Sequence, residues 1–143
     1  MKILICDASV VLKWFKSEAE ENITQAKQIL QVLHKGTIAL FEPELVLLET
    51  ANILTLNKNW PEEKITEALS FLANLDWKLV GLKDKLLNVA TNLARKHGIT
   101  IYDALYLALA HTVNGILVSD DHKHHGKIKS KLVVMLKDWK MSS

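Results

Sequence analysis

The sequence has very little of several features, and each absence narrows the class of protein. Cys6 is the single cysteine among 143 residues, which excludes an internal disulfide and is typical of a reducing cytoplasm. Asp7 ends the first strand-like run, Ile3 to Cys6, so the amino terminus does not resemble a signal peptide. No apolar run approaches the ~18 residues that span a bilayer, so we expect a cytoplasmic protein without membrane contact.

Neither sign of charge dominates the composition. Lysine and arginine together number 18 against 16 acids, which gives a net charge of +2. This value is too small to indicate a nucleic-acid-binding protein by bulk electrostatics, so any basic surface must be local. The 49% hydrophobic content and the length are enough to bury a core. No repeat, low-complexity tract or linker divides the chain, and we expect residues 1–143 to form a single domain.

Short apolar runs alternate with longer helical patterns, which predicts an α/β fold. We expect a central, mostly parallel sheet of four to five strands flanked by helices in three layers. The expected strands are 2–6, 37–41, 77–80, 116–119 and 132–136. The expected helices are 10–15, 18–34, 44–56, 61–72, a helix marked by residues 86–94 that ends at Gly98, and 101–112.

Three local features of these helices are predicted as well. Ser9 is a suitable cap for the first helix, and Pro43 can start the helix over 44–56. That helix is apolar on nearly every side, so we expect it to be deeply buried. With the helix over 61–72 it would form a hairpin that stands off the sheet.

Four acidic residues lie at or inside apolar elements: Asp7 after the first strand, Glu49 within an apolar helix, Asp103 before an apolar run, and Asp121 after the strand over 116–119. An isolated buried carboxylate is costly and usually stays ionised only beside a partner or a metal. Acids that follow two buried parallel strands point into the same crevice of an α/β sheet.

A cation would be needed if these four side chains met. Two carboxylates ~5 Å apart repel by roughly 3 kcal/mol at an effective dielectric near 20. Oxygen ligands suit Mg²⁺ or Mn²⁺ and disfavour zinc. Sites of this kind hold one or two metal ions and act on phosphodiesters.

Each acid also has a purely structural interpretation, and these alternatives stay open. Asp7 could cap a helix, and Asp103 could complete a capping box with Thr100. Asp121 and its neighbour Asp120 could form a turn after a strand. Glu49 could lie on a solvent-facing stripe of its helix. The residues alone do not establish that the four acids meet.

In order and spacing, several segments resemble the PIN-domain ribonucleases, and within them the VapC-type toxins of prokaryotic toxin–antitoxin pairs. The resemblance covers nearly the whole chain. Its segments are Cys6-Asp7-Ala8-Ser9 with the residues to 15, Pro43-Glu44-Leu45 through Glu49-Thr50-Ala51-Asn52, His97 to Ala108 around Tyr102-Asp103-Ala104, Leu117-Val118-Ser119-Asp120-Asp121, and residues 133–139.

The resemblance implies a function and a set of site residues. Asp7, Glu49, Asp103 and Asp121 match the four acidic positions of the family, and Ser119 falls at its hydroxyl position. The family's reaction is the hydrolysis of RNA phosphodiesters with Mg²⁺ or Mn²⁺. Asp7 and Asp103 would hold the main ion, while Glu49 and Asp121 would complete the site. The implied partners are an RNA substrate, a small antitoxin protein and a second copy of this chain, with the predicted hairpin as the surface between copies.

The segment after Asp121 departs from the acidic-then-arginine loop of the family. We interpret residues 122–127, which include three histidines, as a solvated basic loop rather than a zinc or nickel site. Several lysines could contact RNA phosphates, with a solvated charged face as the alternative. They are Lys13, Lys16, Lys123, Lys127, Lys129 and Lys131.

Two other functions remain possible at this level. The altered loop is compatible with a PIN module that binds RNA or a protein partner without cutting. An Mg²⁺-dependent phosphatase with Asp7 as nucleophile is disfavoured, because no second acid stands two residues after Asp7.

Overall fold

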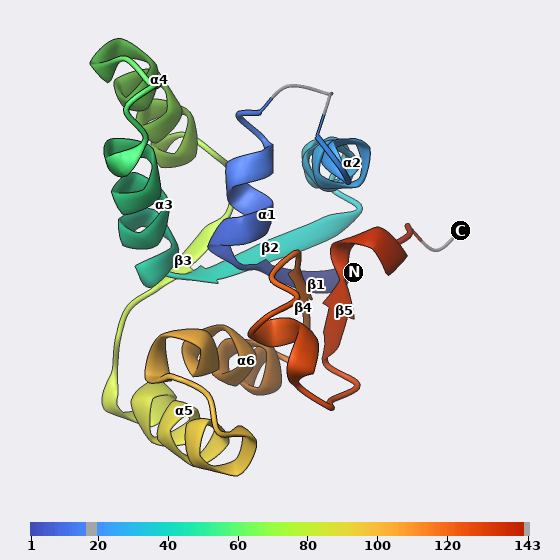
Figure 1. Cartoon of the computed structure of the whole chain (residues 1–143). Coiled ribbons are helices and arrows are strands. Elements are labelled where there is room, and N and C mark those ends of the chain that lie inside the picture. Colours follow the sequence, from blue (N-terminus) through green and yellow to red (C-terminus); the bar gives the residue numbers. More distant parts are fainter. Residues whose placement is uncertain (17–19, 142–143) are drawn as a thin grey trace.

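In a computed structural model of the chain, which describes residues 1–16 and 20–141, the strands form a five-stranded sheet (Figure 1). The strand order is β3-β2-β1-β4-β5, and each neighbouring pair is parallel. The strands are β1 (Lys2–Cys6), β2 (Ile38–Pro43), β3 (Lys78–Val80), β4 (Ile116–Ser119) and β5 (Val133–Met135). The predicted parallel sheet is therefore confirmed.

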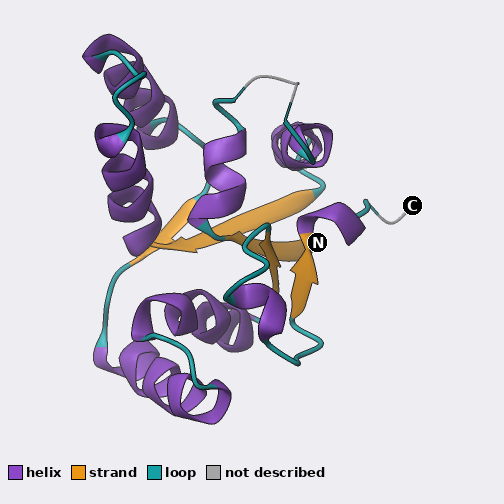
Figure 2. Ribbon diagram, viewed as in Figure 1, coloured by secondary structure: helices purple, strands orange, loops and turns teal. Residues whose placement is uncertain are grey.

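Helices cover both faces of the sheet, which confirms the predicted three layers (Figures 1 and 2). Helices α1 to α4 lie on one face, and α5 and α6 lie on the other. The helices are α1 (Ala8–Lys13), α2 (Ile23–His34), α3 (Leu45–Leu56), α4 (Glu62–Ala73), α5 (Asp84–His97) and α6 (Ile101–Val113), with two short 3-10 helices, η1 (His125–Lys127) and η2 (Leu136–Asp138). No helix formed by residues 1–16 and 20–141 has the length and apolar character that crossing a membrane requires.

The centre of the sheet is buried on both faces. Cys6 has no exposed surface, and it pairs with Val118 of β4 in parallel register. A continuous apolar strand such as β1 is typical of this position. At Gly115, just before β4, a Cβ atom would lie only 2.7 Å from the Ile5 Cδ1 atom and 3.0 Å from the carbonyl oxygen of Ile3. Glycine at this position therefore lets β4 approach β1 closely.

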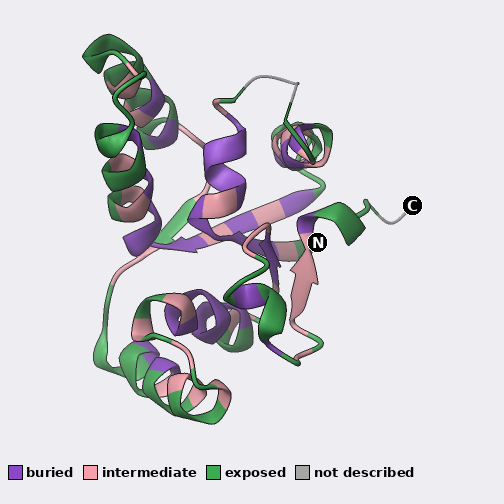
Figure 3. Ribbon diagram, viewed as in Figure 1, coloured by how far each residue is buried: buried purple, intermediate pink, exposed green. Residues whose placement is uncertain are grey.

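Helix α6 contributes a long buried segment to the core (Figure 3). Every residue from Ala104 to Ala110 is buried, and α6 packs against β1, β2 and β4. The run of apolar residues that follows Asp103 in the sequence thus packs against the sheet. Asn114, with a left-handed φ of 55°, ends the helix.

Three predicted helix starts are wrong. Helix α1 begins at Ala8 with Asp7 as its N-cap, and Ser9 lies inside the helix. Pro43 is the last residue of β2 and does not start a helix, because the Glu44 N–H still donates to the carbonyl of Val80 at 3.0 Å and prolongs the pairing with β3. The helix predicted over 18–34 begins only at Ile23, because Asn22, with a left-handed φ of 63°, is its N-cap. Residues 18–19 of the prediction lie outside the described residues.

Helix α3 is not deeply buried, contrary to the prediction. Leu48 is 69% exposed, Leu56 is 71% exposed and Ile53 is 46% exposed. The reason is that α3 and α4 form the predicted hairpin, which stands away from the sheet (Figure 1). In that place α3 packs on α1 and α4 and leaves its remaining side to solvent.

Candidate active site

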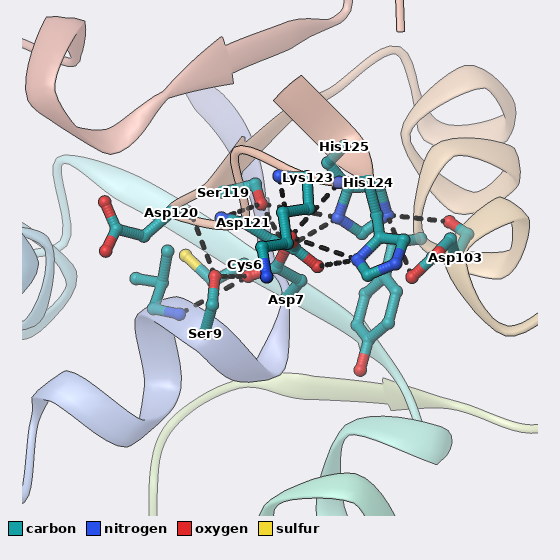
Figure 4. A network of polar contacts seen from close by, with 12 residues as sticks. Cys6, Asp7, Ser9, Asp103, Ser119, Asp120, Asp121, Lys123, His124 and His125 are labelled. Carbon is teal, nitrogen blue, oxygen red and sulfur yellow. Dashed lines mark hydrogen bonds and ion pairs between the residues drawn. The ribbon is translucent and has the colours of Figure 1, made fainter. Parts of the chain in front are cut away.

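The candidate site lies where the order of the strands reverses. From the central β1 the chain builds β2 and β3 on one side, then returns to build β4 and β5 on the other. The crevice beyond the carboxyl ends of two such strands is where α/β sheets usually bind ligands. Asp7 directly follows β1, and its N–H donates to the Val118 carbonyl of β4 at 3.3 Å. Figure 4 shows the polar contacts around this point.

Asp7 is 3% exposed, and its carboxylate accepts hydrogen bonds from four donors. Oδ1 accepts from the Ser9 hydroxyl and, at 3.3 Å, from the Val10 N–H, which makes Asp7 the N-cap of α1. Oδ2 accepts from the Ser119 hydroxyl and faces His125 Nδ1 at 2.6 Å. The structural interpretation of Asp7 as a cap is therefore correct, and one carboxylate oxygen additionally faces the candidate site.

Two serines connect Asp7 to the end of β4. The Ser9 hydroxyl accepts the Asp120 N–H at 2.9 Å, and the Ser119 hydroxyl accepts the Asp121 N–H at 3.0 Å. Each hydroxyl then donates its own proton to Asp7. Ser119 is fully buried, and its hydrogen bond orients the Asp7 carboxylate.

His125 lies between Asp7 and Asp103 (Figure 4). Its side chain is 2% exposed, with Nδ1 on Asp7 and Nε2 2.9 Å from the Asp103 carbonyl oxygen. The ring also meets Tyr106 edge to face, with 5.8 Å between ring centroids. Burial by itself would lower the pKa of His125, but the hydrogen bond and charge of Asp7, with a smaller contribution from Asp103, outweigh it and raise the pKa to about 9.

The prediction that residues 122–127 form a solvated loop is therefore wrong at His125. His122 and His124 are exposed, as predicted, with side-chain exposures of 58% and 59%. Nothing in the local sequence separates His125 from these two neighbours. Its burial is set by the 3-10 turn η1, which directs this one ring back toward the end of β1.

Asp103 lies in the first turn of α6, where Thr100 caps the helix. The Thr100 hydroxyl accepts the Asp103 N–H at 3.2 Å, as the capping-box pattern predicted. The Asp103 carboxylate is 18% exposed, and its Oδ1 atom lies 3.8 Å from His125 Nε2. The cap fixes the helix start, while the carboxylate remains directed at the site.

Glu49 reaches the site from α3 and is held by a buried phenol. The Tyr106 hydroxyl donates to Glu49 Oε1, and Tyr106 is 1% exposed. Burial raises the pKa of Glu49; the Tyr106 hydrogen bond opposes this, and the charges of Asp103 and Asp7 raise it further. Glu49 is thus electrostatically coupled to two of the other acids from the sequence pattern.

The adjacent acids after β4 have different partners. Asp120 pairs with Lys13 at 3.2 Å and accepts from the Asn22 amide at 3.1 Å. Asp121 faces His124 Nδ1 at 2.9 Å. Partial burial raises the pKa of Asp121, but hydrogen bonds from the His124 side chain and N–H outweigh it, so the pKa is lowered overall.

Lys13 does not suit the role of an RNA contact. It is 8% exposed, and besides Asp120 its ammonium donates to the Glu21 carbonyl at 2.9 Å. Both partners hold it inside the protein. Asp120 is accordingly committed to a structural ion pair, whereas Asp121 faces the loop.

Glu42 is a site-neighbouring residue that the sequence analysis missed. It has no exposed surface, Oε2 accepts the Cys6 N–H at 2.7 Å, and Oε1 has no partner. Burial raises the pKa of Glu42, the hydrogen bond from the Cys6 N–H opposes this, and the charge of Asp7 raises it again, so the pKa of this carboxyl lies well above its ordinary value. The signal was an acid between Phe41 and Pro43, one residue beyond the expected end of the strand.

Cys6 is a residue of the hydrophobic core. Burial, followed by the charges of Glu42 and Asp7, raises the pKa of its thiol well above the ordinary value. A neutral, fully buried thiol has no nucleophilic role.

The acids do not form a ready metal cage in this arrangement. Within residues 1–16 and 20–141, no three or more His, Cys, Asp and Glu side chains are grouped so that they could hold a metal ion. Asp7 and Asp103 instead contact opposite nitrogens of one imidazole ring. The charge of that ring also contributes to lowering the pKa of Asp121, and it partly offsets the rise in the pKa of Glu49. All four acids therefore interact electrostatically with His125.

Comparison with known proteins defines the class. The PIN domain family matches residues 4–129, and the chain belongs to this family. Ribonuclease VapC3 from Pyrobaculum aerophilum is 28% identical over 123 residues, which cover 86% of this chain and 92% of that protein.

Solved structures share the fold at lower identity. VapBC2 from Rickettsia felis, bound to a DNA fragment from its promoter, gives a TM-score of 0.67 at 15% identity and covers 96% of this chain and 99% of that chain. VapC20 from Mycobacterium tuberculosis, a toxin that cleaves the sarcin–ricin loop, gives 0.64 at 13% identity, with 84% and 91% covered. At these identities the likeness shows the fold alone.

Proposed function

We propose that this protein is a VapC-type endoribonuclease that hydrolyses RNA phosphodiester bonds in the cytoplasm and is the toxin of a toxin–antitoxin pair. The observation that carries the proposal is the convergence of Asp7 and Asp103 on the two nitrogens of His125, beyond the carboxyl end of β1 in a PIN-family chain. The 28% identity to a protein named a ribonuclease, across most of both chains, supports the same activity.

The proposed enzyme depends on a divalent cation, Mg²⁺ or Mn²⁺. The donor set fits such an ion in its chemistry, because carboxylate oxygens are the ligands that both ions prefer. Asp7 and Asp103 would hold the main ion, and Glu49 and Asp121 would complete the site. A bound divalent ion supplies positive charge that offsets the negative charge growing on the phosphoryl group during attack by water.

The remaining roles belong to side chains that fix the acids. Ser119 donates to Asp7 Oδ2 and so sets the rotation of that carboxylate. Tyr106 does the same for Glu49 from the opposite side of the core. Both donors are buried, so water does not compete for these hydrogen bonds. The acids are in this way oriented before any substrate binds.

RNA cleavage by the purified protein tests the proposal. We expect cleavage with Mg²⁺ or Mn²⁺ and loss of cleavage with EDTA or in Asp7→Asn, since the amide removes the charge that a cation needs. Asp84→Asn is the matched control, because Asp84 lies in the first turn of α5 on an exposed surface. Cleavage that is equal in all these samples would refute a metal-dependent reaction at Asp7.

A second function, RNA or protein binding without cleavage, is favoured by one observation. His125 occupies Asp7 and Asp103 in this arrangement, and the described residues form no metal-holding group. RNA affinity without turnover in any divalent metal, across several structured RNAs, would favour this alternative. Turnover that depends on Asp7 would exclude it.

Exposed lysines after Asp121 are the proposed contacts for RNA phosphates. They are Lys123, Lys127, Lys129 and Lys131. Such contacts position a nucleic acid without reading its sequence. Replacing Lys127 and Lys129 by glutamine should weaken RNA binding and flatten its dependence on salt, as filter binding at several salt concentrations would measure.

The proposed antitoxin binds in a groove beside the α3–α4 hairpin. A pocket of about 780 Å³ lies between α1, α2 and α4, and its apolar lining includes Trp14, Phe15, Trp60 and Phe71. Phe71 is 43% exposed there. The apolar face of a helical segment would fit such a groove.

Co-expression with the adjacent small open reading frame tests this partner. We expect the two proteins to co-purify, and Phe71→Asp to reduce co-purification because it places a charge in the groove. Leu87→Asp, an exposed site on α5 outside the groove, is the control. Independent purification of the two wild-type chains would refute the pairing.

The proposed homodimer forms through the exposed side of α3. Leu48 and Leu56 lie two turns apart and are both about 70% exposed, the kind of apolar surface that marks an interface. Leu48→Glu with Leu56→Glu should convert a dimer to a monomer in size-exclusion chromatography with light scattering. A wild-type protein that is monomeric throughout the micromolar range would refute this interface.

A further inference from the structure

The candidate site around Asp7 and Asp103 contains a cationic side chain, His125. His125 Nδ1 faces the Asp7 carboxylate at 2.6 Å, and Nε2 faces the Asp103 backbone carbonyl at 2.9 Å. An ionised carboxylate and a carbonyl can only accept hydrogen bonds, so each ring nitrogen must donate. The ring therefore carries both protons and a positive charge.

The positive charge of His125 lies close to the four acids and offsets part of their negative charge. The ring is bonded to Asp7, and its Nε2 atom is 3.8 Å from the Asp103 carboxylate. Its charge also acts on the carboxyls of Glu49 and Asp121. The ring is almost fully buried, so solvent screens these interactions weakly.

Asp7 has no acceptor position left for a metal ion. A carboxylate offers about four lone-pair positions, and the four donors to Asp7 occupy them. Val10 N–H is part of the start of α1, and the Ser9 and Ser119 hydroxyls link Asp7 to the backbone after β4. His125 is the one charged donor, so it is also the one that a divalent cation would repel.

We propose that His125 and a divalent cation compete for Asp7. In the metal-free protein the ring is the internal counter-ion of the acids, and a metal ion binds Asp7 only when the ring has withdrawn from it. This inference rests on the proposed function in taking Asp7 as a metal ligand. It also explains why the acids, though coupled, do not form a metal-holding group among the described residues.

Metal affinity tests the competition without RNA. We would measure Mn²⁺ binding to the full chain at constant neutral pH, from the electron paramagnetic resonance signal of free Mn²⁺. His125→Asn keeps an amide near Asp7 but removes the charge, so Mn²⁺ should bind at least about tenfold more tightly than to wild type. His122→Asn makes the same replacement at an exposed site of the same loop and should change the affinity by less than about twofold.

A second measurement needs no variant and so does not depend on variant folding. In the metal-free wild type, the Nδ1 proton of His125 is buried between two heavy atoms and should give a downfield, slowly exchanging NMR signal. Saturating Mg²⁺, which is diamagnetic, should remove that signal as the ring leaves Asp7. The His122 ring, whose side chain is 58% exposed in the same loop, serves as the comparison.

Three results would overturn the inference. The first is Mn²⁺ binding to folded His125→Asn that is equal to or weaker than wild type, which would make the ring a support for the metal. The second is a His125 signal that persists at saturating Mg²⁺. The third is the absence of binding to wild type and variant alike. Failure to cleave RNA while competition is observed would refute only the proposed ribonuclease.

Discussion

The charge on His125 should make the stability of the metal-free protein depend on pH in a specific way. Its pKa rises from 6.5 to about 9 on folding, so the folded state binds this proton more tightly than the unfolded chain does. At about 1.4 kcal/mol for each tenfold change in proton affinity, the shift corresponds to about 3 kcal/mol. Because the folded-state pKa is raised, this stabilisation is fully present below about pH 6.5 and is lost as pH rises through about 9.

His125→Gln isolates this contribution, because glutamine has no proton to lose in that range. We would measure urea unfolding of both proteins in EDTA, at intervals between about pH 6 and pH 10. The free energy of unfolding of wild type should exceed that of the variant by most at low pH, and the difference should shrink by about 3 kcal/mol toward pH 10. Other groups that titrate in this range, such as the Cys6 thiol, are common to both proteins and cancel.

A constant difference between the two proteins across this pH range would refute the reasoning. It would mean that the ring is neutral in the folded state and that one of its contacts is not a hydrogen bond. His122→Gln controls for the general loss of a histidine from the loop. The His122 side chain is 58% exposed, so this variant should not reproduce the pH-dependent difference.

Three further substitutions test single contacts. Glu42→Gln should leave the free energy of unfolding at neutral pH unchanged or higher. The pKa of Glu42 is raised in the folded protein, so wild type loses stability as pH rises above the ordinary pKa of a glutamate, and glutamine avoids that loss. Urea unfolding near pH 5 and pH 8 measures the difference. Tyr106→Phe should cost about 1–2 kcal/mol and raise the pKa of Glu49, as chemical denaturation and carboxyl NMR would show. Ser119→Ala should cost about 1–3 kcal/mol in thermal or urea unfolding, because it removes a donor to Asp7.

Exposed residues of the same type provide the controls. Tyr102→Phe changes a phenol that is 58% exposed, and Ser70→Ala changes an exposed serine of α4, so both should be close to neutral. If the exposed and buried members of either pair changed stability equally, the hydrogen bonds of Tyr106 or Ser119 would not contribute as argued. A loss of several kcal/mol in Glu42→Gln would show that the Glu42 carboxyl is ionised.

Much of the fold could be predicted because its signals are local. The continuous apolar run of β1 and the run Ile116 to Ser119 gave strand bounds that the structure confirms. Gly98, with a φ of 64°, ends α5 as predicted, since glycine adopts this backbone conformation without strain. The burial of α3 could not be predicted in this way. An apolar helix is buried only where another element covers it, and the outer side of the hairpin is uncovered within the described residues.

Part of the candidate site could likewise be predicted from local sequence signals, and part could not. Acids at the ends of β1 and β4 were expected to meet, because parallel strands end at the same edge of a sheet. The structure gives Asp7 and Asp103 capping contacts that the sequence offered as alternatives, and their role as metal ligands stays a prediction. The pairing of Asp120 with Lys13 could not be foreseen, because nothing local says which of two adjacent acids turns inward.

The sequence by itself determined the order of the strands and helices along the chain and the places of the four acids among them. These follow from apolar periodicity and from residue type, which each segment carries without reference to the rest of the chain. The family was indicated by the resemblance of several segments to the PIN-domain ribonucleases. Only the tertiary structure decided what lies among the acids. His125 reaches the site because the turn after β4 brings its ring next to Asp7, 118 residues away in the sequence. The hydrogen bond and charge of Asp7 there stabilise a positive charge that burial alone would disfavour.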